Sequence, residues 1–588
     1  MIFLVEKIRQ LISVAVIKKF PDTKCAIKVE YPAQYSNGDY STNIALELGK
    51  ATDENPRRVA EELLEIIKKP NWISKIEVAG PGFINFFLSE KFLTDFLDEI
   101  RNAGAVNGAA NGAANGATSG ATNYGASDAY KGKTVVSDTS NPNIAKPMGA
   151  HHLLSTIIGD SLTRIFAAAG YRVVRDNYLG DWGTQFGKLI YAYKTWGDEK
   201  TVKKNPIPEL LKLYVKFHDE AERDGALEDA GRVEFKKLEE GNAENKKLWK
   251  WIVDLSMEEF QKLYKRLGVT FDLIHGESFY EDKMQEIIDE GIKKKIFVTG
   301  EGGALIAPFS HEKYPPCLIR KSDGATLYAT RDLARVKYWE RTWHPDLMVM
   351  VVDMAQTMHF QQFLEVSKMM KLTAARNLHI SFGRMRFPEK RMSTRKGNIV
   401  LMEELLDEAE ERAYKIVCEK NPELSEKRKK EVARQVGIGA VKYAILSQNR
   451  STDITFTWDK ILSLDGNSAP YLQYVYARGR SIMRRSKAKS GSANKSSYTL
   501  QQPQELTLAR FLPRFPEIIL RAAEEFKPNL IANYLYEVAS AFNTFYQAVP
   551  VIQAPPNARE TRLKLVEATT IVLKNGLALL GIETPEEM

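Results

Sequence analysis

Two adjacent histidines, His151 and His152, are the first candidates for chemistry in this sequence. They stand near the start of a helical pattern that follows a β-branched run and a loop at Asn141-Pro142-Asn143. The first N–H groups of a helix have no internal partners and carry partial positive charge, so a helix start of this kind binds anions. The pattern predicts an anion site with two imidazoles beside it. The alternative is an ordinary strand-to-helix turn with two surface histidines.

A basic loop is the second candidate. The segment from Arg386 to Val400 contains Arg391, Arg395 and Lys396, together with Ser393. Cations on a mobile-looking loop can clamp a phosphate that is being transferred. A merely solvated basic loop is the alternative interpretation.

An acidic and aromatic pair is the third candidate. Tyr328 and Asp332 are four residues apart in a helical pattern, so they share a face and could approach one cationic ligand together. Gln356 and His359 follow a long apolar strand pattern, at its carboxyl end. The alternative is a surface tyrosine and aspartate beside Arg331.

Aromatic side chains mark two further regions. Phe83, Asn85 and Phe87 alternate after the tight turn at Gly80-Pro81-Gly82, and a ring beside an amide can hold an unstacked RNA base. Near the C-terminus, helical spacing brings together Tyr471, Tyr474 and Arg478, which can stack on and pair with splayed bases. Plain packing is the alternative in both regions.

Strands and helices alternate around these candidates. A strand at Lys133–Val136, a helix and a second strand from Tyr171 form the unit of a parallel sheet, whose ligands bind beyond the carboxyl ends of the strands. Charged helices at about 195–300 interrupt the sheet as an insertion. We expect the sheet to resume at Ala304–Phe309 and to continue with the apolar strand from Asp346.

Composition sets broader limits. The net charge of +8 reflects 83 basic and 75 acidic residues, a mild bias toward a polyanionic partner. The three cysteines are far apart, which excludes a zinc knuckle and predicts a reducing compartment. No apolar run reaches the ~18 residues of a membrane span. The opening residues read as a docked amphipathic helix, and Asn102–Ser127, which lacks charge and bulk, reads as a flexible tether.

Three motifs together resemble the class I aminoacyl-tRNA synthetases, and among them the arginyl-tRNA synthetases. The family's S-P-N-x-A-K-P-x-H-x-G-H is similar to Asn141–His152, and its K-M-S-K-S to Arg391–Arg395. The sequence G-D-W-G-T-Q-F-G occurs unaltered at Gly180–Gly187. One departure is that H-x-G-H reads G-A-H-H at Gly149–His152. Another is Asp138, which stands where a glutamate is common.

The resemblance implies an α/β fold with a Rossmann-type parallel-sheet catalytic domain, a small α+β N-terminal domain and an all-α C-terminal domain. We expect an N-terminal domain for the tRNA elbow at 1–101, a flexible linker at 102–130, a catalytic domain with a helical insertion at 131–460, and an anticodon-binding domain at 461–588.

The resemblance also assigns roles to residues. The expected catalytic residues are Lys146, His151, His152, Arg391, Ser393, Arg395 and Lys396. The expected ATP-binding residues are Gly149, His151, His152, His359, Met392 and Ser393. The expected arginine-binding residues are Asp138, Asn143, Tyr328, Asp332 and Gln356. The expected tRNA-binding residues are Phe83, Asn85, Phe87, Tyr471, Tyr474 and Arg478.

The implied activity is the activation of L-arginine with ATP and Mg²⁺ and its transfer to tRNA(Arg). We expect no protein-bound metal, no membrane association, a monomer and a cytoplasmic location. A noncatalytic RNA-binding protein that keeps the fold is the alternative, favoured by the altered H-x-G-H. Another class I synthetase is a further alternative, against which Tyr328, Asp332 and the G-D-W-G-T-Q-F-G motif argue.

Overall fold

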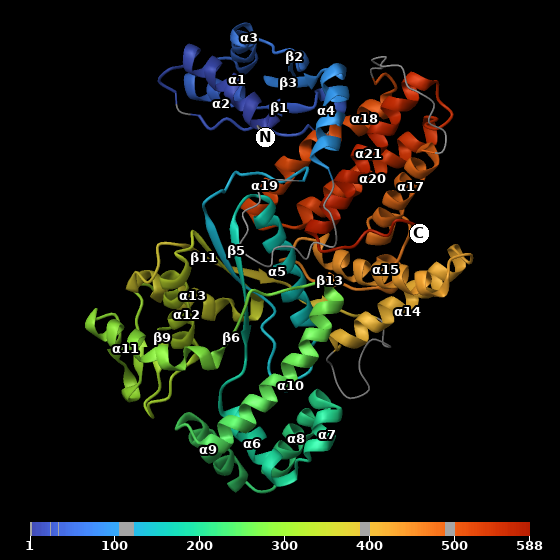
Figure 1. Cartoon of the computed structure of the whole chain (residues 1–588). Helices are drawn as coiled ribbons and strands as arrows, with labels where there is room; N and C mark the ends of the chain where they lie inside the picture. Colours follow the sequence, from blue (N-terminus) through green and yellow to red (C-terminus); the bar gives the residue numbers. More distant parts are fainter. Residues whose placement is uncertain (1–2, 24, 33, 105–122, 389–399, 488–499) are drawn as a thin grey trace.

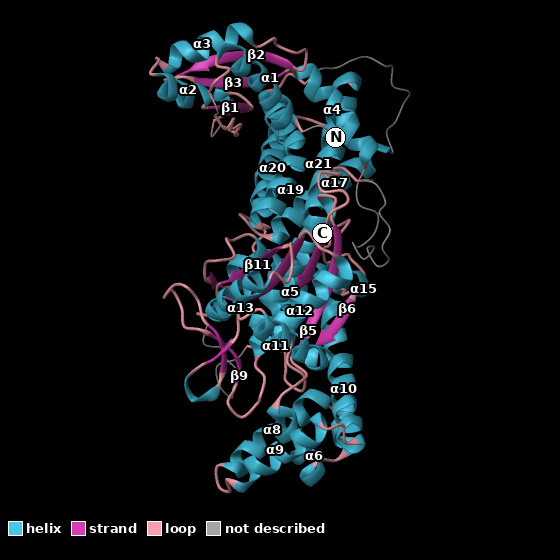
Figure 2. Ribbon diagram, turned by 90° about the vertical axis from the view of Figure 1, so that its left-hand side faces the viewer, coloured by secondary structure: helices cyan, strands magenta, loops and turns pink. Residues whose placement is uncertain are grey.

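The computed structural model describes the chain from residue 3 to 588, apart from residues 24, 33, 105–122, 389–399 and 488–499. The molecule is elongated (Figures 1 and 2). The N-terminal unit lies at one end, a group of helices inserted after β5 lies at the other, and a parallel sheet lies between them. Among the described helices, none is both long enough and apolar enough to cross a membrane.

The N-terminal unit packs helices on a small antiparallel sheet of order β1-β3-β2. The predicted hairpin is confirmed: Gly80 and Gly82 turn the chain at positive φ between β2 and β3. The opening helix is also confirmed. The elements are α1 (Leu4–Lys19), β1 (Tyr40–Thr42), α2 (Ile44–Thr52), α3 (Pro56–Ile66), β2 (Ile73–Ala79), β3 (Phe83–Leu88) and α4 (Glu90–Ala103).

The expected linker at 102–130 is wrong at both described ends. Residues 102 and 103 belong to α4, and within residues 123–130 the side chains of Tyr124 and Tyr130 contact the C-terminal part of the chain. Tyr124 is only 1% exposed, and its hydroxyl donates to the carbonyl of Leu512 at 2.7 Å. Asn575 in turn donates to the carbonyl of Tyr124 at 2.8 Å. One large aromatic ring supplies the apolar area that anchors an otherwise small-residue stretch.

The parallel sheet has the order β11-β10-β4-β5-β6. The strand order reverses at β4: β5 and β6 lie on one side of it, and β10 and β11 lie on the other. Asp138 at the end of β4 pairs in register with Met350 of β10. Such a switch point is where open α/β sheets bind ligands. The strands are β4 (Thr134–Asp138), β5 (Arg172–Leu179), β6 (Leu273–Gly276), β10 (Leu347–Asp353) and β11 (Arg376–Phe382).

Helices cover both faces of this sheet, which explains why β10 is apolar at almost every position. Val349 and Val351 join the core that includes α5 (Ala150–Ala168). Met348 and Met350 join the opposite core, which includes Leu333 of α12 (Tyr328–Trp343). Further helices on that side are α11 (Met284–Lys293) and α13 (Thr357–Met370).

The predicted helical insertion is confirmed in part: the inserted helices lie between β5 and β6 at 184–267, whereas the predicted range of about 195–300 also contains β6 of the parallel sheet and α11. The insertion consists of α6 (Thr184–Trp196), α7 (Glu199–Lys204), α8 (Pro206–Ala221), α9 (Ala226–Glu239) and α10 (Ala243–Leu267). The expectation that the parallel sheet resumes at Ala304–Phe309 is wrong. Those residues form β8 (Leu305–Ala307) in a separate antiparallel sheet with β7 (Val298–Thr299) and β9 (Cys317–Arg320). The short connections between these strands suit antiparallel pairing, since a parallel connection needs a long crossover.

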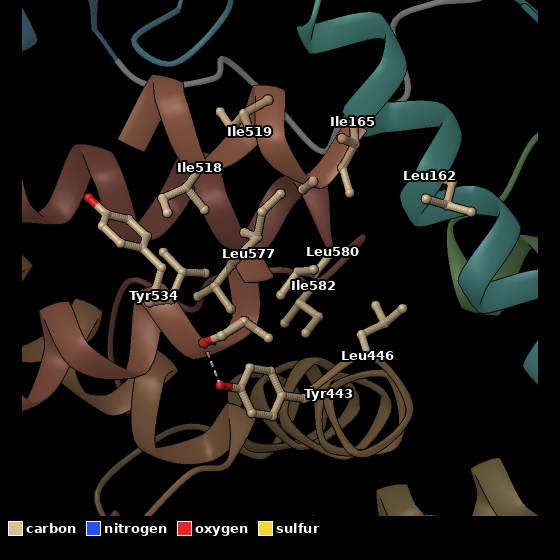
Figure 3. Packing of buried hydrophobic residues seen from close by; sticks show 14 of the residues in the cluster. Leu162, Ile165, Tyr443, Leu446, Ile518, Ile519, Tyr534, Leu577, Leu580 and Ile582 are labelled. Atoms are coloured by element: carbon tan, nitrogen blue, oxygen red, sulfur yellow. Dashed lines mark hydrogen bonds between the residues drawn. The ribbon is translucent and has the colours of Figure 1, made fainter. Parts of the chain in front are cut away.

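The C-terminal part is helical and packs on α5, the helix that covers one face of the parallel sheet. Figure 3 shows Leu162 and Ile165 of α5 facing Ile519, Leu577 and Leu580. The helices are α14 (Met402–Lys420), α15 (Glu426–Leu446), α16 (Trp458–Ile461), α17 (Ala469–Lys487), α18 (Pro503–Phe511), α19 (Phe515–Glu525), α20 (Asn529–Ala548) and α21 (Pro556–Leu579). Two-residue strands β12 (Met385–Arg386) and β13 (Ile454–Thr455) pair beside them.

Candidate active site

The start of α5 places one imidazole as a fixed donor. The backbone N–H of Gly149 donates to Nδ1 of His152 at 3.1 Å. Burial, and to a lesser degree His151, lowers the pKa of His152 to about 3, so its ring is neutral near pH 7. Because Nδ1 accepts this bond, the proton of the neutral ring is on Nε2. His152 therefore offers one N–H to a ligand at the start of α5, where the backbone N–H groups of Ala150, His152 and Leu153 already donate to the carbonyls of Val400 and Gly149.

His151 lies next to it and is more exposed. The centroids of the two imidazole rings are 3.8 Å apart. Burial lowers the pKa of His151 as well, which favours a neutral ring. The sequence-predicted pair of histidines is thus confirmed at the helix start, in two different environments.

The loop before α5 is held in an unusual backbone conformation. Ser140, Asn141 and Ala145 all have positive φ, which is costly for residues with a Cβ. The loop is fixed from several sides: the N–H of Ser140 donates to Ser155 at 3.0 Å, and the N–H of Ala145 donates to Ser256 at 3.1 Å. Such strain, maintained by surrounding bonds, is typical of sites that must be rigid.

The G-D-W-G-T-Q-F-G motif supports the same loop. The N–H of Gly180 donates to the carbonyl of Pro142 at 3.0 Å, and the N–H of Ile144 donates to the carbonyl of Gly180 at 3.2 Å. A Cβ on Gly180 would lie 2.5 Å from Oδ1 of Asn143. The two motif-bearing loops therefore meet at one edge of the sheet, as the sequence predicted.

The basic loop cannot be placed in full. Arg391, Met392, Ser393, Arg395 and Lys396 lie outside the described residues. The chain directly after it is anchored at the helix start: the N–H of Ala150 donates to the carbonyl of Val400 at 3.0 Å, and the N–H of Met402 donates to the carbonyl of Met148 at 2.8 Å. The C-terminal end of this loop is thus joined to the backbone that precedes His152.

Three charged side chains form a buried cluster on the other side of the switch point. Asp138 and Asp332 are both buried, and Arg335 lies between them. Its Nη1 is 2.5 Å from Oδ2 of Asp138, and its Nη2 is 2.9 Å from Oδ1 of Asp332. The other oxygen of Asp332 is 2.6 Å from Nε2 of His359. The structure therefore brings together three predicted residues through Arg335, which sequence reasoning missed.

The two carboxylates differ electrostatically. Burial raises the pKa of Asp138 to about 7, although the Arg335 guanidinium acts in the opposite direction. Burial also raises the pKa of Asp332, but Arg335 and the bond with His359 outweigh it and leave this pKa below its ordinary value. The sequence contained one signal for Arg335: it follows Asp332 by three residues on a helix, and side chains three apart on a helix are neighbours.

The remaining predicted arginine-binding residues lie at the rim. Tyr328, the first residue of α12, is 64% exposed. Gln356 ends the short helix η4 (Met354–Gln356) after β10 and is exposed, as is Asn143. Lys146 is turned to the helical insertion, where its Nζ is 5.0 Å from the ring centroid of Tyr214. Tyr328, Gln356 and Asn143 are thus exposed, whereas Asp138 and Asp332 are buried.

The predicted RNA-reading trio in the N-terminal unit is only partly available. Phe83 is 39% exposed, and Phe87 is half-buried with Nζ of Lys75 5.2 Å from its ring centroid. Asn85 is 2% exposed and accepts a hydrogen bond from Ser41 at 2.7 Å. Oδ1 of Asn85 is therefore bonded to its neighbour in register on β1, and a contact of this amide with an RNA base stays a prediction.

The predicted tRNA-binding side chains of α17, Tyr471, Tyr474 and Arg478, are linked by hydrogen bonds, two of which involve Asn543 of α20. Asn543 accepts from Arg478 at 2.8 Å and donates to the hydroxyl of Tyr471 at 2.9 Å. Arg478 also donates to the hydroxyl of Tyr474 at 2.9 Å. Its guanidinium lies 4.9 Å from the ring centroid of Tyr546, which sequence reasoning missed together with Asn543.

In the part of the chain that the structure describes, no group of three acidic, histidine or cysteine side chains could hold a metal ion.

Comparison with known proteins gives three family matches in chain order. The Arginyl tRNA synthetase N terminal domain matches residues 6–88, the catalytic domain of class I (R) tRNA synthetases matches residues 119–458, and the DALR anticodon binding domain matches residues 472–588. The catalytic match begins ahead of residues 123–130, in accord with their packing on the body of the protein.

Individual relatives agree with these matches. The chain is 45% identical over 552 residues to an arginine–tRNA ligase of Fusobacterium nucleatum, covering 94% of this chain and 93% of the relative. It is 42% identical over 564 residues to an arginine–tRNA ligase of Clostridium kluyveri, covering 95% and 96%. A crystal structure of arginyl-tRNA synthetase from Plasmodium falciparum is 26% identical, with a TM-score of 0.82 over 100% of both chains. The chain therefore belongs to the arginyl-tRNA synthetase family of class I aminoacyl-tRNA synthetases.

Proposed function

We propose that this chain joins L-arginine to tRNA(Arg) in two steps at the carboxyl edge of its parallel sheet. Membership of the arginyl-tRNA synthetase family over nearly the whole chain is the observation that carries the proposal. The relatives described above are named as ligases, which gives the noncatalytic alternative no support.

In the first step, a carboxylate oxygen of arginine attacks the α-phosphorus of ATP. The bond from that phosphorus to the bridging oxygen breaks, pyrophosphate leaves, and arginyl-adenylate remains. In the second step, a terminal ribose hydroxyl of tRNA attacks the arginyl carbonyl and AMP leaves. Neither step needs an enzyme nucleophile, so the protein must position the reactants and stabilise charge on phosphate oxygens.

The start of α5 fits the ATP phosphates. Nε2 of His152 supplies an N–H at this helix start, whose partial positive charge favours an anion. A neutral imidazole can donate there without itself adding charge. His151 lies beside it in place of the family's glycine, and we assign it the donor role of the histidine that Gly149 replaces. His359 completes the described part of the proposed ATP site.

The basic loop is assigned to the same phosphates. Arg391, Arg395 and Lys396 would neutralise the leaving pyrophosphate, and Met392 and Ser393 would line the nucleotide. The junction of Ala150 with Val400 supports this assignment, since it joins the end of the loop to the helix start. ATP would carry Mg²⁺ as its counterion, so that the metal belongs to the substrate.

The buried acidic cluster fits the guanidinium of arginine. Asp138 and Asp332 supply planar carboxylates, the chemistry that a guanidinium prefers. Tyr328, Gln356 and Asn143 would complete the pocket from its rim. For tRNA, we assign Tyr471, Tyr474 and Arg478 to the anticodon, and Phe83, Asn85 and Phe87 to the elbow.

The test is aminoacylation with each of the twenty amino acids, total tRNA, ATP and Mg²⁺. Arginine alone should be attached, and pyrophosphate exchange should require tRNA, as the family resemblance implies. Attachment of lysine or glutamine instead would contradict the proposal. Absence of any arginine- and tRNA-dependent ATP turnover in the folded protein would favour the noncatalytic alternative. Light scattering on the same sample would test the predicted monomer, and cell fractionation the predicted cytoplasmic location.

A further inference from the structure

Arg335 is a guanidinium of the protein itself, buried among the carboxylates assigned to the substrate guanidinium. It is 2% exposed and pairs with Asp138 on one side and with Asp332 on the other. Its guanidinium carbon lies 4.3 Å from the ring centroid of Tyr178 and 5.3 Å from that of Trp339. The two ion pairs and the two rings hold it in one position.

The pairing leaves acceptor capacity on the carboxylates. An ionised carboxylate has about four lone-pair positions, and Arg335 uses one oxygen of each partner. Oδ1 of Asp138 is buried and has no hydrogen-bond partner among the described residues. A second guanidinium could therefore bind at Oδ1 of Asp138 without displacing Arg335, whereas the second oxygen of Asp332 is already bonded to Nε2 of His359.

The charge of Arg335 would favour binding of a substrate guanidinium by keeping both carboxylates ionised. Two buried carboxylates that face one site repel each other, and one of them then takes up a proton and stops attracting a cation. When both carboxylates are ionised, Asp138, Asp332 and Arg335 together carry a formal charge of −1. That charge matches a substrate side chain with one positive charge.

Arg331, one turn earlier on α12, does not share this role. Its guanidinium contacts Glu281 at 2.5 Å and Glu277 at 3.6 Å, not the carboxylates of the pocket. Arg341, near the end of the same helix, is largely exposed and contacts Glu286 at 3.4 Å. Arg335 is thus the arginine of these three that touches the proposed substrate site.

We propose that Arg335 is a positioning residue for arginine recognition: it holds Asp138 and Asp332 in their binding geometry and sets the pocket's charge for one guanidinium. The inference rests on the proposed function. It predicts a defect confined to arginine, because Arg335 touches neither the start of α5 nor the basic loop's anchor at Val400 among the described contacts.

The experiment compares arginylation kinetics of the wild type with Arg335→Ala, Arg335→Lys and Arg341→Ala. Arg335→Ala should raise KM for arginine by about 10- to 100-fold, leaving KM for ATP and kcat within about threefold. The KM of Arg335→Lys for arginine should lie between those of the wild type and Arg335→Ala. Lysine keeps the charge but loses the contacts that two separate guanidinium nitrogens make with Asp138 and Asp332. Arg341→Ala is the matched control and should match the wild type.

Guanidinium ion gives a readout that a structural role would not produce. At millimolar concentration it should lower KM for arginine in Arg335→Ala by filling the vacated position, and it should inhibit the wild type by competing with arginine. Sodium chloride at the same ionic strength should do neither.

Several outcomes would overturn the inference. They are a wild-type or lower KM for arginine in folded Arg335→Ala, an equal rise of KM for ATP, or no rescue by guanidinium. If circular dichroism shows that Arg335→Ala is unfolded at the assay temperature, Arg335→Lys decides: a wild-type KM for arginine there rejects the inference. Failure of the wild type to charge arginine would instead reject the proposed function.

Discussion

At the scale of single residues, His152 illustrates how a backbone contact fixes a tautomer. Gly149 donates to Nδ1, and burial keeps the ring neutral, so Nε2 has one proton to donate. The altered motif puts His151 where the family has glycine, and a side chain there raises a steric objection to ATP. The exposed position of His151 leaves it free to turn toward the phosphates.

We predict that His152→Ala slows adenylate formation by about 10²–10³-fold, as for the loss of one preorganised donor. His151→Ala should also slow it if His151 replaces the missing donor. Single-turnover measurement of adenylate with saturating tRNA checks both variants. A faster His151→Ala would show that the side chain merely obstructs the nucleotide.

Asp332 is the second residue-scale case, because it serves Arg335 and His359 at once. We predict that Asp332→Ala lowers kcat/KM for arginine by an amount equivalent to about 2–5 kcal/mol, since the buried guanidinium of the substrate then lacks its carboxylate partner. Steady-state arginylation measures this, with Arg341→Ala as the control variant. Wild-type arginine kinetics would remove Asp332 from the site.

At the scale of elements, the segment between α4 and β4 combines two kinds of sequence. Residues 105–122 are small and uncharged, whereas Tyr124 packs near the rings of Phe96 and Phe515, at centroid distances of 6.2 and 5.9 Å. Loop length and aromatic burial act on stability by different routes, so the two parts of the segment can be tested separately.

We predict that deleting half of residues 105–122 changes the free energy of unfolding by only a few tenths of a kcal/mol, because loop-closure entropy varies with the logarithm of length. Tyr124→Ala should instead cost about 3–5 kcal/mol, as for other large core rings. Urea titration of both variants makes the comparison. A large effect of the deletion would mean that those residues pack or bind.

At the scale of the whole molecule, buried polar contacts join parts that are far apart in the sequence. Glu517 of α19 accepts from the N–H of Val5 at 2.7 Å and from the hydroxyl of Tyr31 at 2.5 Å, which docks the N-terminal unit on the C-terminal helices. Lys442 of α15 donates to the carbonyls of Leu267 and Gly581, each at 2.5 Å. Lys442 thus joins the inserted helices to the end of the chain.

Lys442 makes this junction sensitive to pH. Burial lowers its pKa to about 8 from an ordinary 10.5, with Asp160 acting in the opposite direction. The folded state therefore binds this proton less tightly than the unfolded state. The contribution of Lys442 to stability is fully present above pH 10.5 and is lost as the pH falls to about 8.

We predict that the free energy of unfolding of the wild type, minus that of Lys442→Met, increases by about 3 kcal/mol between pH 8 and pH 10.5. Urea titrations across this range measure the difference. Lys427→Met, an exposed lysine on the same helix, is the control and should show no such trend. Parallel curves for the wild type and Lys442→Met would contradict the prediction.

The sequence by itself determined the local features. Apolar runs gave the strands of the parallel sheet, helical spacing gave α5, α12 and α17, and the order of the motifs placed their loops at one edge. These follow from short-range physics, because periodicity and turn chemistry act within a few residues of the chain. The histidines at the start of α5 belong to this class, as does the hairpin at Gly80–Gly82.

Only the tertiary structure decided which polar groups face which partner. Asn85 accepts a hydrogen bond from Ser41 of β1, Ala304–Phe309 joins a different sheet, Tyr124 is buried, and Arg335 lies between two carboxylates. In each case the partner is supplied by a segment distant in sequence or by the opposite strand. Burial and charge pairing depend on distance in space, and a one-dimensional pattern contains no measure of that distance between remote segments.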